Sequence, residues 1–244
     1  MFEVGGESTF GVKQLDNITL GSLRNGQMGL IYGPAGSGKT SLAAHFLFKG
    51  ASSSMNVCLL TTETTSRMAN KMSGFKSFDP KWLREGYLSI FRLQDLADLV
   101  GIRFNEMGPD DLDILYDLII QTLDDMDIKR FMIDPASPLM QIMSRWEKGD
   151  FFQRLRSGIY KRGITCMIVL DNYNLDLVSG YGLADPHMFD IILRFDKDRE
   201  DPIMLNTMRI ERWASSAHSK NTYVVDISQD GVILVPRIKP LEVK

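Results

Sequence analysis

A glycine-rich run in the first part of the chain has the residue types and spacing that most clearly point to chemistry. Residues 33–40 read Gly-Pro-Ala-Gly-Ser-Gly-Lys-Thr and fit the pattern G-x-x-x-x-G-K-[ST]. Glycines let the backbone turn so that successive N–H groups face phosphate oxygens, Lys39 reaches the β- and γ-phosphates, and the Thr40 hydroxyl binds Mg²⁺. We therefore predict a site for ATP and Mg²⁺ made by Gly33, Pro34, Ala35, Gly36, Ser37, Gly38, Lys39, Thr40 and Ser41.

The segments on either side of this run have the patterns needed to position a phosphate loop. Residues 28–32 are a short apolar run typical of a buried strand, and residues 41–49 predict a helix that ends at Gly50. Such a helix directs its positive N-terminal end at the phosphates. Its expected apolar face contains Leu42, Ala43, Phe46 and Leu47.

Acidic residues follow three further apolar runs. Glu63 comes after residues 57–61, Asp134 ends the run 130–134, and Asp171 comes after residues 165–170. Because the carboxyl ends of parallel strands meet at one edge of a sheet, we expect these carboxylates to lie near Gly33. Asp134, which Pro135 follows, fits the Walker B position of a phosphate-loop protein.

The remaining pattern predicts an α/β fold with a doubly wound, mostly parallel sheet flanked by helices. We expect a third strand at 88–91 and helices at 66–74, 109–127 and 151–162, with turns in 1–25 and an irregular segment at 77–86. From Asp190 onward four short strands follow one another without helices, which indicates a C-terminal antiparallel extension of the same sheet. These strands are expected at 191–195, 207–210, 223–227 and 232–235, and residues 1–244 are expected to form one domain.

Composition limits the partners that the chain is expected to have. The formal net charge of -3 and the pI near 5.7 give no overall basic field, so non-specific nucleic-acid binding is not favoured. The N-terminus lacks a signal-peptide pattern, and no apolar run approaches the ~18 residues of a membrane span. We predict a soluble, cytoplasmic protein without membrane insertion, in which Cys58 and Cys166 are buried reduced thiols.

Over almost its full length the chain resembles the KaiC-like branch of the RecA-superfamily P-loop ATPases. Residues 11–16 are similar to that group's lead-in to the phosphate loop, and residues 56–74 and 130–138 resemble two further blocks. A last block runs from Arg212 to Gly231. Its opening sequence, Arg-Trp-Ala-Ser-Ser-Ala-His-Ser-Lys, is what points to this branch among P-loop proteins.

The resemblance implies a RecA-like fold that binds ATP between subunits of a homo-oligomeric ring, usually a hexamer. It assigns Lys39 and Thr40 to phosphate and Mg²⁺, Asp134 to Mg²⁺ through water, and Glu63 to orienting or deprotonating the attacking water. It further implies that some residues contact the nucleotide of a neighbouring subunit and that others lie near the base. The first group is Arg212, His218 and Lys220, and the second is Ile227 and Ser228.

Two departures from the family pattern predict slow ATP hydrolysis or none. The family often has paired glutamates after the second strand, whereas Thr62 precedes Glu63 here. It also carries two cations two residues apart in the last block, whereas Ala214 follows Arg212 at that spacing. A cation supplied by a neighbouring subunit can accelerate turnover by several powers of ten. Asp171 falls near the family's γ-phosphate sensor, where a carboxylate would repel phosphate unless Mg²⁺ or a proton intervened.

Three functions are compatible with this sequence. The first is a weak ATPase whose nucleotide state controls a regulatory or signalling oligomer with an unknown protein partner. The second is an ATP-dependent assembly scaffold without turnover, similar to the archaellum-associated FlaH proteins. A RecA- or RadA-like role on DNA is disfavoured because residues 172–177 are poor in Lys and Arg. We expect His45 and His187 to be structural, and His218 could equally be a plain surface histidine.

Overall fold

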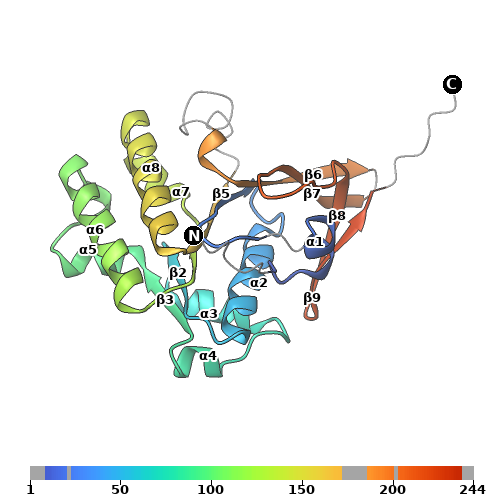
Figure 1. The fold of residues 1–244 in the computed structure, drawn as a ribbon, viewed down its shortest axis with the longest axis horizontal. Coiled ribbons are helices and arrows are strands. Elements are labelled where there is room, and N and C mark those ends of the chain that lie inside the picture. Colours follow the sequence, from blue (N-terminus) through green and yellow to red (C-terminus); the bar gives the residue numbers. More distant parts are fainter. Residues whose placement is uncertain (1–8, 21–22, 172–185, 201–202, 238–244) are drawn as a thin grey trace, which may run out of the picture.

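A single sheet of nine strands, in the order β3-β2-β4-β5-β1-β6-β7-β8-β9, organises the structure (Figure 1). The computed structural model describes residues 9–20, 23–171, 186–200 and 203–237. The first six strands in this order are parallel, and β7, β8 and β9 continue the sheet antiparallel. The strands are β1 (Met28–Gly33), β2 (Val57–Thr61), β3 (Leu88–Arg92), β4 (Arg130–Ile133), β5 (Thr165–Asp171), β6 (Ile191–Glu200), β7 (Ile203–Trp213), β8 (Thr222–Ser228) and β9 (Gly231–Pro236).

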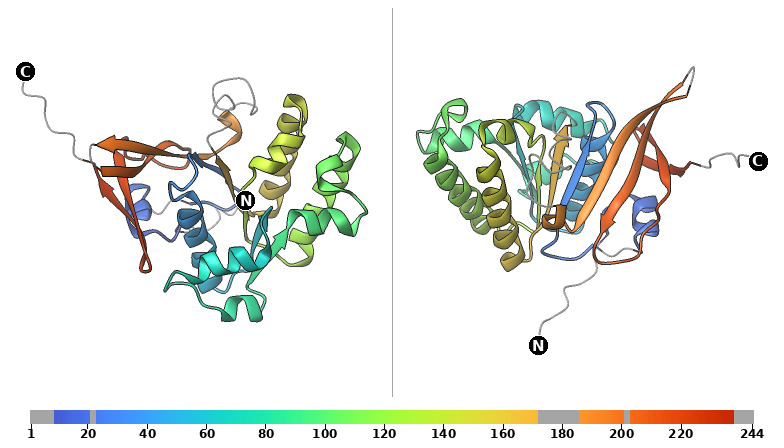
Figure 2. Two further views of the ribbon diagram at one scale, coloured as in Figure 1. Left: turned by 180° about the vertical axis from the view of Figure 1, so that it is seen from behind. Right: turned by 90° about the horizontal axis from the view of Figure 1, so that it is seen from above.

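Helices cover both faces of the parallel part of the sheet, as the two views in Figure 2 show. One core packs side chains of α5, α6, α7 and α8 against the sheet, and the other packs α1, α2 and α3. The helices are α1 (Lys13–Ile18), α2 (Lys39–Ser52), α3 (Thr65–Ser73), α4 (Lys81–Arg84), α5 (Leu93–Leu99), α6 (Pro109–Asp125), α7 (Ser137–Ile142) and α8 (Arg145–Arg162), with short 3₁₀ turns at Phe104–Glu106 and Pro186–Met188.

Successive side chains along each strand point to opposite faces of the sheet, so one strand contributes to both cores. In β1, Leu30 and Tyr32 point into the first core, whereas Ile31 points into the second. The four predicted apolar residues of α2 all lie in the second core. Cys58 and Cys166 are buried free thiols, as predicted. The α/β class, the mostly parallel sheet and the antiparallel C-terminal strands are therefore confirmed.

Several predicted element boundaries are wrong for local physical reasons. Helix α2 runs through Gly50 to Ser52. Gly50 does not end the helix: a Cβ at this position would lie 2.6 Å from Val57, so the glycine allows α2 to pack closely against β2. Helix α8 begins at Arg145, six residues before the prediction. There Ser144 and Glu147 form a reciprocal capping box, a signal visible in the sequence.

Other helices lie where the sequence predicted turns or irregular chain. Helix α1 lies within the predicted turns, where the Asp16 carboxylate accepts hydrogen bonds from the N–H groups of Phe10 and Gly11. Helix α4 occupies part of the segment predicted to be irregular, and α5 and α7 were not predicted. All four have seven residues or fewer, too short to produce a clear helical periodicity.

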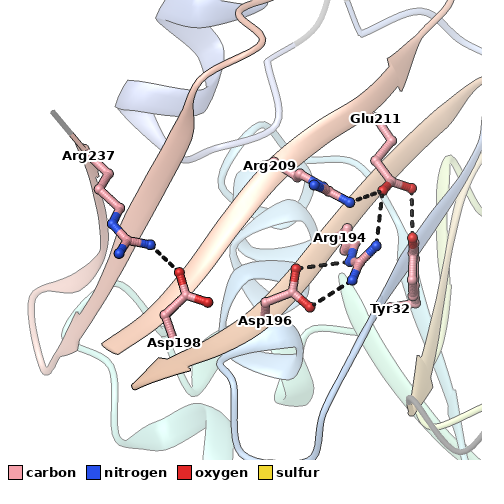
Figure 3. A network of polar contacts seen from close by, with 7 residues as sticks. All are labelled: Tyr32, Arg194, Asp196, Asp198, Arg209, Glu211 and Arg237. Carbon is pink, nitrogen blue, oxygen red and sulfur yellow. Dashed lines mark hydrogen bonds and ion pairs between the residues drawn. The ribbon is translucent and has the colours of Figure 1, made fainter. Parts of the chain in front are cut away.

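Strands β6 and β7 have one face packed in the second core and carry a network of ion pairs on the opposite face (Figure 3). On this opposite face Arg194 lies between Asp196 and Glu211, and Glu211 also accepts hydrogen bonds from Arg209 and from the Tyr32 hydroxyl. The Tyr32 contact, 2.6 Å long, reaches from β1 across β6 to β7. Strands β6 and β7 are longer than predicted because such polar residues interrupt their apolar pattern.

Among the residues that the structure describes, none of the helices has both the length and the apolar composition required to cross a bilayer.

Burial of His45 is expected to make the stability of this fold depend on pH. Its side chain is buried in α2 beside Phe75 and Phe48, and Nδ1 lies 2.8 Å from the Ser41 carbonyl. Burial lowers the pKa of His45, and the hydrogen bond to Ser41 only partly opposes this shift. Below the unfolded-state pKa of about 6.5, the unfolded chain binds a proton that the folded chain resists, so acid reduces the free energy of unfolding.

We expect H45Q to remove this contribution to the pH dependence. Urea unfolding of both proteins at about pH 7.5 and about pH 5.5 should show a smaller acid-induced loss of stability in the variant. Equal losses in the two proteins would contradict the assigned role of His45 burial.

Candidate nucleotide-binding site

The loop between β1 and α2 requires glycine at defined points. Gly33 and Gly38 have φ angles of 153° and 102°, in the region that residues with a side chain rarely adopt. A Cβ at Gly33 would lie 2.4 Å from the Phe195 carbonyl oxygen, and one at Gly38 would lie 2.6 Å from Ile227. The backbone of β6 therefore leaves no room for a side chain at Gly33, whereas at Gly38 the positive φ angle is the main requirement for glycine and the neighbour is the Ile227 side chain.

Lys39, the first residue of α2, folds back over the loop. Its side chain is only 5% exposed, and Nζ lies 2.8 Å from the carbonyl oxygens of both Gly33 and Pro34. Nζ also lies 2.9 Å from Oδ1 of Asp171, the last residue of β5. These three acceptors match the three hydrogens of an ammonium group.

Asp134 is the most strongly perturbed carboxylate of the site. It directly follows β4, is 3% exposed, and accepts a hydrogen bond from the Thr40 side chain. Burial raises the pKa of Asp134 to about 7, although the bond from Thr40 and the nearby Lys39 and Lys71 act in the opposite direction. Within the described residues its Oδ2 atom has no hydrogen-bond partner.

The chemistry of this pair suits a magnesium ion. Mg²⁺ prefers oxygen ligands and retains several waters, so a threonine hydroxyl and a carboxylate that binds one of those waters are a common protein contribution. The unpartnered oxygen of Asp134 would gain a hydrogen-bond donor from such a water. The residues present therefore fit Mg²⁺.

Glu63 lies just after β2 and is held by two cations of α3. Its carboxylate is 2.5 Å from Lys71 Nζ and 3.0 Å from Arg67 Nε, while its backbone N–H donates to the Thr61 hydroxyl. The Glu63 side chain is 24% exposed and faces the same cavity as Lys39. These contacts therefore position the carboxylate before any ligand arrives.

These groups line one cavity of about 510 Å³, within the usual size of small-molecule sites. The lining contains both charged and apolar side chains, which suits a ligand with a charged chain and a flat ring. The polar lining residues are Lys39, Thr40, Ser41, Glu63, Lys71, Asp134 and Asp171, and the apolar lining residues are Ala44, Met72, Phe75, Pro135 and Ile227. Ala35, Gly36 and Gly38 supply loop backbone.

The structure brings together some predicted site residues and leaves others outside the cavity. Gly33 and Pro34 contribute the carbonyls that hold Lys39, and Ser37 is a fully buried residue of the loop. Ser228 is the last residue of β8, and its hydroxyl accepts a hydrogen bond from the Asp230 N–H in the turn to β9. Arg212, His218 and Lys220 are not among the residues that line this cavity.

Sequence reasoning missed most of the apolar lining residues and two cations. Lys71 and Met72 come from α3, and Phe75 lies just beyond this helix. The sequence did contain a signal for this packing, because Met68 and Met72 are spaced i, i+4 and so share one face of the helix. Lys197 of β6 was also missed. Its ammonium nitrogen would lie 3.3 Å from a Cβ at Gly36, on the loop.

A phosphate loop between a central parallel strand and a helix, with carboxylates at the ends of neighbouring strands, defines the class of RecA-like P-loop NTPase folds. A family model described as the KaiC ATPase matches residues 8–239. The chain belongs to the KaiC ATPase family.

Some relatives of this chain are of similar length, and others are much longer than it. Circadian clock protein KaiC2 of Synechocystis is 22% identical, and the match covers 93% of this chain but 39% of that protein. A UPF0273 protein of Aeropyrum pernix is 24% identical, over 93% of this chain and 92% of its own. The structure is also similar to that of a KaiC-like protein from Pyrococcus horikoshii, with a TM-score of 0.78, 19% identity, and coverage of 95% of this chain and all of that one.

The charged form of Asp134 suits Mg²⁺ but is costly to bury, so we expect this residue to reduce the stability of the ligand-free protein. The pKa of Asp134 is about 7 in the folded protein, against about 3.9 for an unfolded aspartate, so the folded chain binds this proton more tightly. Stability must therefore fall as the pH rises through the window between these two values, and the full loss is present above about pH 7.

We expect nucleotide-free D134N to be more stable than wild type at about pH 8, by roughly 2–4 kcal/mol, and this advantage to shrink towards about pH 4.5. Denaturant unfolding without nucleotide or Mg²⁺ measures the difference. A variant that is destabilised at both pH values would show that the Asp134 charge is compensated in the folded state.

Proposed function

We propose that the cavity binds ATP with Mg²⁺ and that the protein is a slow ATPase acting as a nucleotide-controlled regulatory or signalling oligomer. The observation that carries this proposal is the convergence of Lys39, Thr40, Glu63 and Asp134 on one cavity beside a glycine loop. Family membership supports nucleotide binding in general. In this proposal residues 1–244 act as one ATPase domain, and the protein works in the cytoplasm.

Each residue has a role that its environment supports. Lys39 would exchange Asp171 for the β- and γ-phosphates, and Thr40 with Asp134 would hold Mg²⁺, the latter through water. When bound, Mg²⁺ neutralises charge that develops on the phosphate oxygens. Glu63 would orient the attacking water or accept its proton. The apolar lining residues Ala44, Met72, Phe75 and Ile227 would receive the base and sugar.

Slow turnover follows from the surroundings of Glu63. The Glu63 carboxylate already forms ion pairs with Lys71 and Arg67, so at least one of these contacts must loosen before the carboxylate can bind the attacking water. Ala214, which is exposed, also cannot supply a second cation to a neighbour. The same observations favour the second candidate function, a FlaH-like scaffold that assembles on ATP without hydrolysing it.

Assembly into a ring accounts for the predicted residues that lie outside the cavity. Arg212 lies at the end of β7, 3.0 Å from His187, while His218 and Lys220 lie between β7 and β8. In a ring these side chains would contact the nucleotide of the adjacent subunit. A role on nucleic acid is not proposed, and residues 172–177, whose composition argued against it, lie outside the described residues.

Lys71 offers a cation within the same chain. Lys71 lines the cavity, its Nζ atom contacts Glu63, and its charge is near enough to Asp134 to lower the pKa of that carboxyl group. An ammonium at this place would neutralise the terminal phosphate of ATP, which could in part replace the cation missing at Ala214.

Phosphate release and light scattering, with ATP, ADP or no nucleotide, test the proposed function. Wild type should assemble with Mg²⁺ and ATP and release phosphate slowly. K39A should lose nucleotide binding, since the buried cation is gone, while E63Q should bind and assemble but release phosphate only at background rate. Unchanged turnover in E63Q would contradict the assigned role of Glu63, and assembly without any turnover in wild type would establish the scaffold.

Lys71 and Arg67 form a matched pair for testing a cation in the same chain. Both bind Glu63 from α3, but only Lys71 lines the cavity. We expect K71Q to weaken ATP binding by about tenfold, the value of one charge-assisted hydrogen bond, with little effect on ADP. Competition against a fluorescent nucleotide measures both affinities. If R67Q had the same effect as K71Q, the loss would come from Glu63 and not from a phosphate contact.

A further inference from the structure

Asp171 lies beside the phosphate loop because β5 pairs with β1 in parallel. Their register places Asp171 directly opposite Gly33, the first residue of the loop. The backbone N–H of Asp171 donates to the Ser137 hydroxyl at 2.9 Å, which fixes the end of β5 against the start of α7. The Asp171 side chain is 34% exposed, faces the cavity and contacts Lys39 at 2.9 Å.

This contact completes the hydrogen bonding of Lys39. The ammonium group has three hydrogens, and its three close acceptors are the carbonyl oxygens of Gly33 and Pro34 and the carboxylate of Asp171. A phosphate oxygen can therefore bind Lys39 only if one of these acceptors withdraws. The two carbonyls belong to the loop backbone, whereas Asp171 can move away by side-chain rotation.

The charges along the cavity wall reinforce this competition. Its lining includes two cations, Lys39 and Lys71, and three carboxyl groups, Glu63, Asp134 and Asp171. Each cation is in contact with a carboxylate of the same chain. A triphosphate that enters without a metal ion would thus meet, among these lining side chains, no cation that lacks a carboxylate partner, and Asp171 would lie next to its phosphates.

We propose that Asp171 competes with the nucleotide phosphates for Lys39, so that it weakens nucleotide binding and makes the binding of ATP depend strongly on Mg²⁺. This inference rests on the proposed function, since it concerns the same cavity. Asp171 is here a residue that tunes affinity: bound Mg²⁺ offsets the phosphate charge that Asp171 repels, and Lys39 changes partner from carboxylate to phosphate.

The test compares D171N with a matched control, D196N. Asp196 is also in an ion pair of 2.9 Å, with Arg194, and its side chain is 31% exposed, but it lies on the far face of β6. Both variants remove one negative charge, so the control reports the general effect of charge on anion binding. D171S serves as a second variant in case the asparagine retains a strong bond to Lys39.

Binding of ATP is measured by calorimetry with EDTA and, separately, with excess Mg²⁺. We expect D171N to bind metal-free ATP about tenfold more tightly than wild type or D196N, the value of one charge-assisted contact. The gain should be smaller with Mg²⁺. ATP should also raise the melting temperature of D171N more than that of wild type, a readout that does not depend on turnover.

Two results would overturn the inference alone. If D171N bound metal-free ATP no better than D196N, Asp171 would not compete for Lys39. If D171N and D171S bound ATP more weakly than wild type only when Mg²⁺ was present, Asp171 would instead assist metal binding. A wild-type protein that binds no adenine nucleotide under either condition would overturn the proposed function and this inference together.

Discussion

The buried ammonium group of Lys39 is the constraint on which the rest of the site depends. A cation that is 5% exposed requires acceptors, and the loop supplies two carbonyl oxygens at 2.8 Å by turning tightly around the Nζ atom. This turn places Gly33 and Gly38 at positive φ angles, and because neither residue has a side chain, Phe195 and Ile227 can approach the backbone there. Loop shape, lysine burial and the packing of β6 and β8 are thus one arrangement.

The sheet places the other groups relative to this lysine. Strands β2, β4 and β5 end at the same edge as β1, so Glu63, Asp134 and Asp171 reach one cavity although they are distant in sequence. The Tyr32–Glu211 hydrogen bond joins the end of β1 to β7, next to Arg212 (Figure 3). Burial and this bond to Glu211 raise the pKa of Tyr32, which keeps the hydroxyl protonated as the donor. A hydrogen bond therefore links the residue before the phosphate loop to the strand that carries Arg212.

The sequence predicted those features that depend on local pattern. The phosphate loop has a fixed spacing, the strands have dense apolar runs, and each carboxylate follows a strand, so the parallel sheet and the grouping of Glu63, Asp134 and Asp171 near the loop could be expected. Contacts that depend on side-chain conformation could not. No pattern indicates that Lys39 binds Asp171 or that Lys71 reaches Glu63 from eight residues away, because both depend on how α2 and α3 are oriented against the sheet. The short helices α1, α4, α5 and α7 were missed because tertiary packing and single hydrogen bonds, and not periodicity, stabilise them.

The central claim is that this cavity holds a triphosphate through Lys39, and a crystal structure with Mg²⁺ and a non-hydrolysable ATP analogue tests it most directly. The account predicts the phosphates against the loop backbone, the metal beside Thr40 and Asp134, and Lys39 Nζ moved from Asp171 to a phosphate oxygen. An analogue bound elsewhere on the molecule, with the Lys39–Asp171 ion pair still in place, would contradict it.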